Sequence, residues 1–218
     1  HLDFEKSAHI VIEESFPTVH IIACQFHLGQ SWYRKIQSNN YLLNQYKNNT
    51  EIGLWLKYFF GLAFLPPEQV DDGFVELISI APIDNHTFSD YILEHYINKE
   101  SQFPPNIWAE TPVNNTRTTN GPEDFHRTYN GQFYSPHPPT HVVISVLKET
   151  QAQTLTIINS IKNNVHKPMA KKDKLLIEST LQNYNDYKVH KDLTLYLRKT
   201  GNFYQGKNLK KMNPKYES

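Results

Sequence analysis

The amino-acid sequence predicts an α/β fold in which a block of helices interrupts a sheet-containing core. Three observations lead to this prediction. The first 28 residues follow the pattern of a strand end, a helix and a buried strand. Residues 29–102 show helical periodicity and no strand signal. A helix that gathers polar side chains on one side then follows around residue 123.

The N-terminal segment predicts one βαβ unit. Residues 1–4 match the end of a strand, and residues 5–15 repeat apolar side chains at helical spacing. Residues 19–26 are β-branched and apolar on both faces, which is typical of a strand buried between helices. Such a unit pairs its two strands in parallel. Because functional groups collect at the carboxyl ends of parallel strands, Asp3, Cys24 and His27 are candidate site residues.

Apolar residues at helical spacing predict four helices in the central block. They cover about residues 28–37, 52–63, 70–81 and 88–96. A long apolar stripe predicts a further helix from about residue 143 to residue 161. Beyond it, the pattern is loose and allows two short helices, at 175–181 and 193–197.

The helix expected around Glu123 separates apolar from polar side chains. Pro122 suits its first turn, where a missing N–H costs nothing. One side carries Phe125, Tyr129 and Phe133; the other carries Glu123, His126, Arg127 and Asn130. The polar side predicts part of a site. A second interpretation stays open, because Asn120 and Glu123 have nearly the spacing of a capping box, which alone explains the acid.

Composition narrows the class of protein. The 218 residues include 13% aromatic and 20% charged residues, which argues for a packed core rather than a disordered chain. Cys24 is the single cysteine, so no disulfide within the chain is possible and a reducing compartment is favoured. No apolar run approaches the ~20 residues that span a bilayer, so no membrane association is expected. The start at His1 suggests a fragment of a longer protein.

Charge divides the chain into an acidic body and a basic tail. Residues 1–161 hold 9 Lys and Arg against 17 Asp and Glu, whereas residues 162–218 hold 13 against 5. This asymmetry is typical of proteins with a polyanionic partner such as DNA. Two other interpretations stay open: an ordinary solvated tail, or a tail that docks on the acidic body.

Several short motifs follow one another along the chain. They are Leu2-Asp3-Phe4-Glu5-Lys6-Ser7-Ala8 with Phe16-Pro17, Cys24-Gln25-Phe26-His27, Leu62-Ala63-Phe64-Leu65-Pro66, Phe103-Pro104 to Trp108, Thr119-Asn120 to Glu123 with His126, and His137-Pro138. With these motifs in this order, roughly residues 1–150 resemble the transposases of Mutator-like DNA elements. The basic tail carries no matching motif.

The resemblance implies a partial ribonuclease-H-like fold. Its core would comprise residues 1–28 and 103–161, and the all-helical insertion would occupy residues 29–102. The basic tail, residues 162–218, would follow as a mostly helical or disordered segment.

The resemblance also implies the chemistry of the DDE-type transposases. Three acids would hold two Mg²⁺ or Mn²⁺ ions, which activate the attacking oxygen and stabilise the leaving oxygen during phosphodiester cleavage and strand transfer. By motif position, Asp3 matches the second acid and Glu123 the last. The first acid would lie on a strand before His1, so this chain is expected to be inactive alone, although a longer parent can be active.

The remaining candidates have two interpretations each. Cys24, His27 and His126 match the family's active-site surroundings. Cys24 and His27 also have the spacing of half a zinc site, although no second pair of ligands follows, or of a buried thiol beside a hydrogen-bonded imidazole. The cations Arg34, Lys35 and Arg127 would contact the DNA backbone, or are ordinary solvated charges.

Two functions follow from these expectations. The first is a transposase-derived, DNA-binding nuclear protein, which allows a homo-oligomer and has no small-molecule substrate. The alternative is a domesticated, non-catalytic nuclear protein that binds DNA or another protein through its helical block and basic tail.

Overall fold

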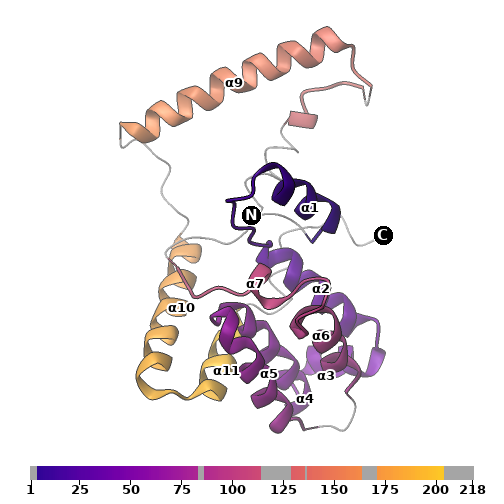
Figure 1. Cartoon of the computed structure of the whole chain (residues 1–218), viewed down its shortest axis with the longest axis vertical. Helices are drawn as coiled ribbons and strands as arrows, with labels where there is room; N and C mark the ends of the chain where they lie inside the picture. Colours follow the sequence, from indigo (N-terminus) through magenta and orange to yellow (C-terminus); the bar gives the residue numbers. More distant parts are fainter. Residues whose placement is uncertain (1–3, 83–85, 114–128, 136, 164–170, 204–218) are drawn as a thin grey trace. The chain divides into compact units, whose positions relative to one another are not determined.

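The computed structural model describes residues 4–82, 86–113, 129–135, 137–163 and 171–203. The described residues are mostly helical (Figure 1). The α-helices are α1 (Lys6–Ser15), α2 (Gln25–Gln37), α3 (Asn40–Asn48), α4 (Glu51–Tyr58), α5 (Val70–Ser79), α6 (Thr87–Ile92), α7 (Pro105–Trp108), α9 (Thr140–Lys162), α10 (Lys171–His190) and α11 (Leu193–Phe203). Two 3-10 helices, η1 (Phe59–Phe64) and η2 (Pro67–Gln69), and a π-helix, η3 (Leu93–Ile97), complete them.

The prediction of an α/β fold is wrong, because the described residues contain no strand or sheet. The segment 19–26, expected to be a buried strand, is extended only as far as Cys24, and α2 begins at Gln25. Val19 is 50% exposed, and the Ala23 N–H donates to the Ile107 carbonyl oxygen at 2.7 Å. A β-branched run alone therefore does not make a strand here, since among the described residues it forms a single bridge at Ala23 and no ladder of backbone hydrogen bonds. The prediction of a partial ribonuclease-H-like fold is therefore also wrong.

The chain divides into two compact units. The first comprises residues His1–Thr118 and Lys172–Ser218, and the second comprises Thr119–Lys171. In the first unit, α2, α4, α5 and α6 correspond to the four helices that the sequence predicts, whereas α3 was not predicted. The described ranges contain no helix with the length and apolar character that crossing a membrane requires.

Trp32 of α2 lies at the centre of the core of the first unit. Its ring meets those of Trp108, Phe60 and Tyr96 edge-on, with centroids 5.6, 5.7 and 5.7 Å apart. Leu28 and Ile36, one turn to either side on α2, are also buried, as the helical spacing predicts. Edge-to-face aromatic contacts of this kind add to the stabilisation that burial alone gives.

The hairpin of α3 and α4 shows how local signals place the helices. The Asn39 side chain caps α3 by accepting hydrogen bonds from two backbone N–H groups, and the Thr50 hydroxyl caps α4 by accepting one from the Gly53 N–H. Asn49, in the left-handed conformation at φ 54°, ends α3. At Gly53 the two helices approach so closely that a Cβ atom would lie 2.0 Å from the Gln45 carbonyl oxygen.

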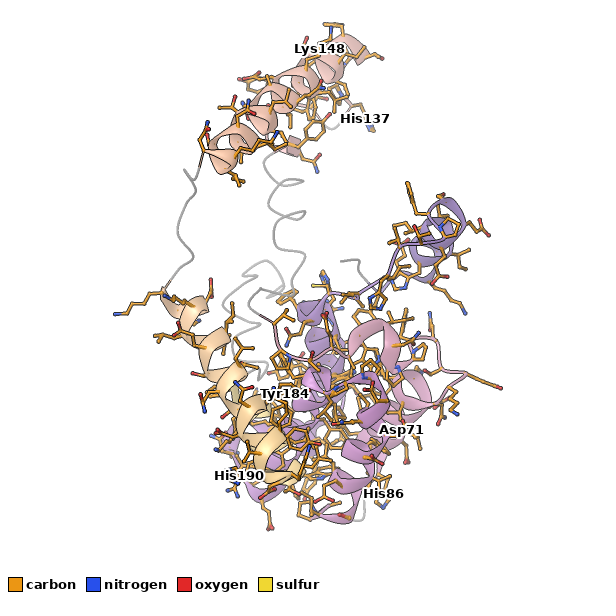
Figure 2. All side chains as sticks on the ribbon, turned by 60° about the vertical axis from the view of Figure 1, so that its left-hand side comes forward. Asp71, His86, His137, Lys148, Tyr184 and His190 are labelled. Carbon is orange, nitrogen blue, oxygen red and sulfur yellow. The ribbon has the colours of Figure 1, made fainter. Side chains whose placement is uncertain are left out.

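The segment predicted as a separate basic tail contributes to the core of the first unit. Helix α11 packs against α4, η1 and α5, and it buries Tyr196, Leu197, Thr200 and Gly201. The Tyr196 hydroxyl donates to the Phe64 carbonyl oxygen at 2.8 Å. Tyr184 of α10 lies where that helix borders the core (Figure 2).

The second unit, by itself, consists largely of α9. None of its 23 residues is buried. Side chains radiate from it along its length in Figure 2, Lys148 among them. A hollow beside its first turn is lined by Tyr129, Asn130, Phe133, Ser135, Pro138 and Val143.

Candidate functional site

The predicted metal ligands Asp3 and Glu123 lie outside the described residues, as do His126 and Arg127. The residues that the structure does describe contain no group of three or more His, Cys, Asp or Glu side chains that could hold a metal ion. Those residues alone therefore offer no ligand set for Mg²⁺ or Mn²⁺, which requires several oxygen ligands. No chemical step is derived through a metal.

Cys24 and His27 open α2. Cys24 is the N-cap residue, and its side chain is fully buried in the core. His27 lies in the first turn, half-buried, with its ring edge-on to that of Phe26 at 5.2 Å. The two residues thus occupy one turn, and zinc sites in proteins require at least one further protein ligand. Their positions fit a packed thiol and a positioned imidazole.

His27, Ser31 and Lys35 recur every fourth residue and so share one side of α2. On that side, the Ser31 hydroxyl hydrogen-bonds the Tyr91 hydroxyl at 3.0 Å and the Tyr96 hydroxyl at 2.8 Å. The two phenol oxygens are 3.3 Å apart. Three hydroxyls from α2, α6 and η3 therefore form a closed cluster, which sequence analysis did not identify.

The π-helix η3 explains how two tyrosines reach one serine. Residues five apart point about 140° away from each other on an α-helix. The wider π-turn, in which residue i bonds residue i+5, brings Tyr91 and Tyr96 to the same side instead. Such single π-turns often mark functional sites, but no sequence pattern used here predicts one.

Burial favours the neutral form of the Tyr96 phenol in this hydroxyl cluster. Burial raises the pKa of the Tyr96 phenol above its usual range, and the hydrogen bond from Ser31 lowers that pKa by less. The Lys35 ammonium lies over the Tyr91 ring, 4.9 Å from its centroid. Because the three hydroxyls form hydrogen bonds with one another, the cluster joins α2 to α6 and η3. Its role is therefore structural rather than catalytic. Lys35 supports that joint rather than standing as an isolated charge.

The most distinctive polar surface lies on α10 and α11. Seven cations are exposed on these helices and in the turn between them: Lys171, Lys172, Lys174, Lys188, Lys191, Arg198 and Lys199. Within the described part of the chain, the ion pair found among them joins Lys174 to Glu178 at 3.8 Å, between exposed side chains. The Lys188 ammonium also lies 5.2 Å from the centre of the Tyr184 ring.

The packing of α11 explains why its cations face outward. Tyr196, Leu197, Thr200 and Gly201 recur at helical spacing and fill the buried side. Arg198 and Lys199 fall on the opposite side and are exposed.

No protein-family model, no curated protein and no solved structure matches this chain. The resemblance to Mutator-like transposases therefore remains a prediction from the sequence motifs. The function must be argued from the chain's own side chains.

Hydroxyl groups attach α10 and α11 to the rest of the first unit, and stacked aromatic rings join α10 to α11. The Tyr187 hydroxyl donates to the Gln69 side-chain oxygen at 3.1 Å, and its ring stacks on Tyr196 with centroids 4.9 Å apart. The Thr194 hydroxyl bonds the Glu76 carboxylate. Residues 171–203 therefore dock on the rest of the first unit, while their exposed lysines and arginine remain directed toward solvent. The interpretation of the tail as docked and its interpretation as solvated are thus compatible for these residues.

Proposed function

We propose that this chain binds DNA through the exposed cations of α10 and α11, as the helical, non-catalytic part of a transposase-derived nuclear protein. One observation carries the proposal: seven exposed cations lie on two helices and the turn between them, and the opposite sides of these helices pack on a core. Over residues 171–203, seven Lys and Arg residues stand against four Asp and Glu residues.

Phosphate contacts suit this surface better than base contacts do. Lysine and arginine side chains that neutralise phosphates release condensed counterions, which supplies affinity without reading sequence. Helix α10 carries one group of lysines at its first turn, from Lys171, and another at its end, around Lys188. The two groups are roughly 25 Å apart at 1.5 Å per residue, a length that follows several phosphates of a duplex. The proposal requires neither Asp3 nor Glu123.

The test measures binding of the full chain to two 30-base-pair duplexes of unrelated sequence by fluorescence anisotropy, between 50 and 200 mM salt. Equal affinities and a steep fall with salt are expected, because each phosphate contact contributes about −0.9 to the slope of log K against log salt. Unequal affinities would show sequence readout, and no binding at low salt would exclude the proposal.

A matched pair of double variants locates the surface. Arg198→Gln with Lys199→Gln removes two exposed charges from α11, and we expect the salt slope to fall by about one to two. Lys47→Gln with Lys99→Gln removes two exposed charges elsewhere in the same unit and serves as the control. Equal effects of the two double variants would contradict the assignment to α11.

A further inference from the structure

Among the described residues of the second unit, no other helix packs along α9. It spans Thr140–Lys162, and none of its 23 residues is buried. Leu147, Ile157 and Ile161 are 50%, 60% and 54% exposed. Most helices in proteins owe their stability to packing of an apolar face, which makes an uncovered helix of this composition a candidate interface.

The apolar residues of α9 follow the heptad spacing of coiled coils. Alternating steps of four and three residues connect Val143, Leu147, Thr150, Thr154, Ile157 and Ile161. We name this row the α9 seam. A 3.5-residue repeat of this kind keeps the row facing one partner helix along its whole length, roughly 27 Å at 1.5 Å per residue.

The two threonines in the middle of the α9 seam are compatible with an apolar contact. The Thr150 hydroxyl donates to the Val146 carbonyl oxygen and the Thr154 hydroxyl to the Thr150 carbonyl oxygen, both at 2.8 Å. Because the helix's own carbonyl groups satisfy both hydroxyls, no unpaired donor would enter a helix–helix contact.

The α9 seam is palindromic, and this property identifies its partner. Reversed about residue 152, Val143 exchanges with Ile161, Leu147 with Ile157, and Thr150 with Thr154. Two antiparallel copies would therefore set aliphatic side chains against aliphatic side chains at both ends and threonine against threonine at the centre. We propose that α9 is a homodimerisation helix that pairs with α9 of a second copy of this chain in antiparallel orientation.

Charge agrees with a self-complementary interface. Between His141 and Ile161, the charged side chains are Lys148 and Glu149, and both lie outside the α9 seam. Two identical seams therefore meet without like-charge repulsion. An isologous contact about a two-fold axis is also the commonest way in which identical chains assemble. At one end, Val143 borders the hollow lined by Tyr129 and Phe133, so these rings would flank the contact.

The first test is the mass of the full chain in solution, measured by light scattering during size exclusion and by sedimentation. The unsubstituted chain is expected at twice its 25.5 kDa mass, and Leu147→Glu at that mass itself. Leu155→Glu is the matched control, because Leu155 is 53% exposed, close to the 50% of Leu147, but lies outside the α9 seam. A monomeric unsubstituted chain, or equal effects of the two variants, would overturn the proposal.

The second test determines the orientation. A Thr150→Cys chain is mixed with a Thr154→Cys chain under mild oxidation, and the disulfide-linked products are separated by tag. Antiparallel pairing places residue 150 opposite residue 154 of the other copy, so the mixed product should dominate over each like pair by about tenfold. Like pairs as the main products indicate a parallel arrangement and refute the antiparallel dimer. Circular dichroism of every variant confirms that α9 remains helical.

Discussion

Helices α9 and α11 both carry apolar residues at helical spacing, yet only α11 is packed. Four of its 11 residues are buried, whereas none of the 23 residues of α9 is. Apolar content does not explain the difference, since α9 carries more aliphatic side chains. The packing surface explains the difference, because Gly201 of α11 lies against α4 and Gly61 of η1 lies against α11.

Apolar residues at helical spacing are common to both helices, whereas small residues determine how closely a helix can pack against its neighbours. At Gly201 a Cβ atom would lie 2.3 Å from the Lys57 carbonyl oxygen, and at Gly61 one would lie 2.9 Å from the Leu197 carbonyl oxygen. The two backbones thus approach to distances that side chains would prevent. Helix α9 has no glycine, and its heptad row suits the wider spacing of paired helices.

Truncating one leucine on each helix should give the largest contrast. Leu197 of α11 is fully buried, and Leu197→Ala is expected to lower the free energy of unfolding by about 3 kcal/mol, through lost burial and the cavity left behind. Leu147 of α9 lies in the second unit, so Leu147→Ala should leave the free energy of unfolding of the first unit unchanged within about 0.5 kcal/mol. Urea unfolding followed by tryptophan fluorescence reports on the first unit, because Trp32, Trp55 and Trp108 all lie there. Similar losses in both variants would contradict the comparison.

Adding one methyl group at Gly201 tests the close approach directly. On an exposed helix, glycine to alanine stabilises by about 1 kcal/mol. Here Gly201→Ala is expected to destabilise by about 2 kcal/mol, because the Cβ atom meets backbone at 2.3 Å from Lys57 and 2.9 Å from Tyr58, and backbone cannot rotate away. Lys199→Ala, on the exposed side of α11, is the control. The sign of the change decides, and a stabilised Gly201→Ala chain would show that the interface is looser than described.

Local sequence signals predicted the helices well, because their causes are local. Leu28, Trp32 and Ile36 repeat at helical spacing on α2, and all three are buried. The βαβ unit failed for the opposite reason. A run such as residues 19–26 is compatible with a strand, but a sheet depends on a distant partner that periodicity does not reveal.

The candidate site was less predictable than the helices. Ser31 follows His27 by one helical turn and could have been noticed. The π-turn that brings Tyr96 to it could not, because it depends on packing around η3. The basic segment was expected for its charge, yet the hydroxyls of Tyr187 and Tyr196 and the close approach at Gly201 fix it to the core. Asp3 and Glu123 remain predictions, since both lie outside the described residues.

A smaller effect on the free energy of unfolding should appear at high pH, because α10 docks near acidic residues. Burial raises the pKa of the Tyr187 phenol above its usual range, and Tyr184 and Asp72 raise it further. The neutral phenol is thus favoured in the folded state, so its contribution to stability is complete below pH of about 10, the unfolded pKa. This contribution to stability is lost as the pH rises from about 10 through the raised pKa of Tyr187 in the folded state.

Comparing Tyr187→Phe with the unsubstituted chain isolates this contribution. The difference between their urea midpoints, followed by circular dichroism, should shrink steadily as pH rises above about 10, because the phenylalanine chain has no phenol to ionise there. Tyr134→Phe removes a fully exposed tyrosine from the second unit and should keep a constant midpoint difference at every pH. A Tyr187→Phe difference that stays constant to pH 11.5 would mean that the Tyr187 contact with Gln69 does not depend on a neutral phenol. In that case the stacking of Tyr187 on Tyr196, rather than its hydrogen bond to Gln69, would hold α10, and both helices would be attached to the core chiefly through the close packing of α11.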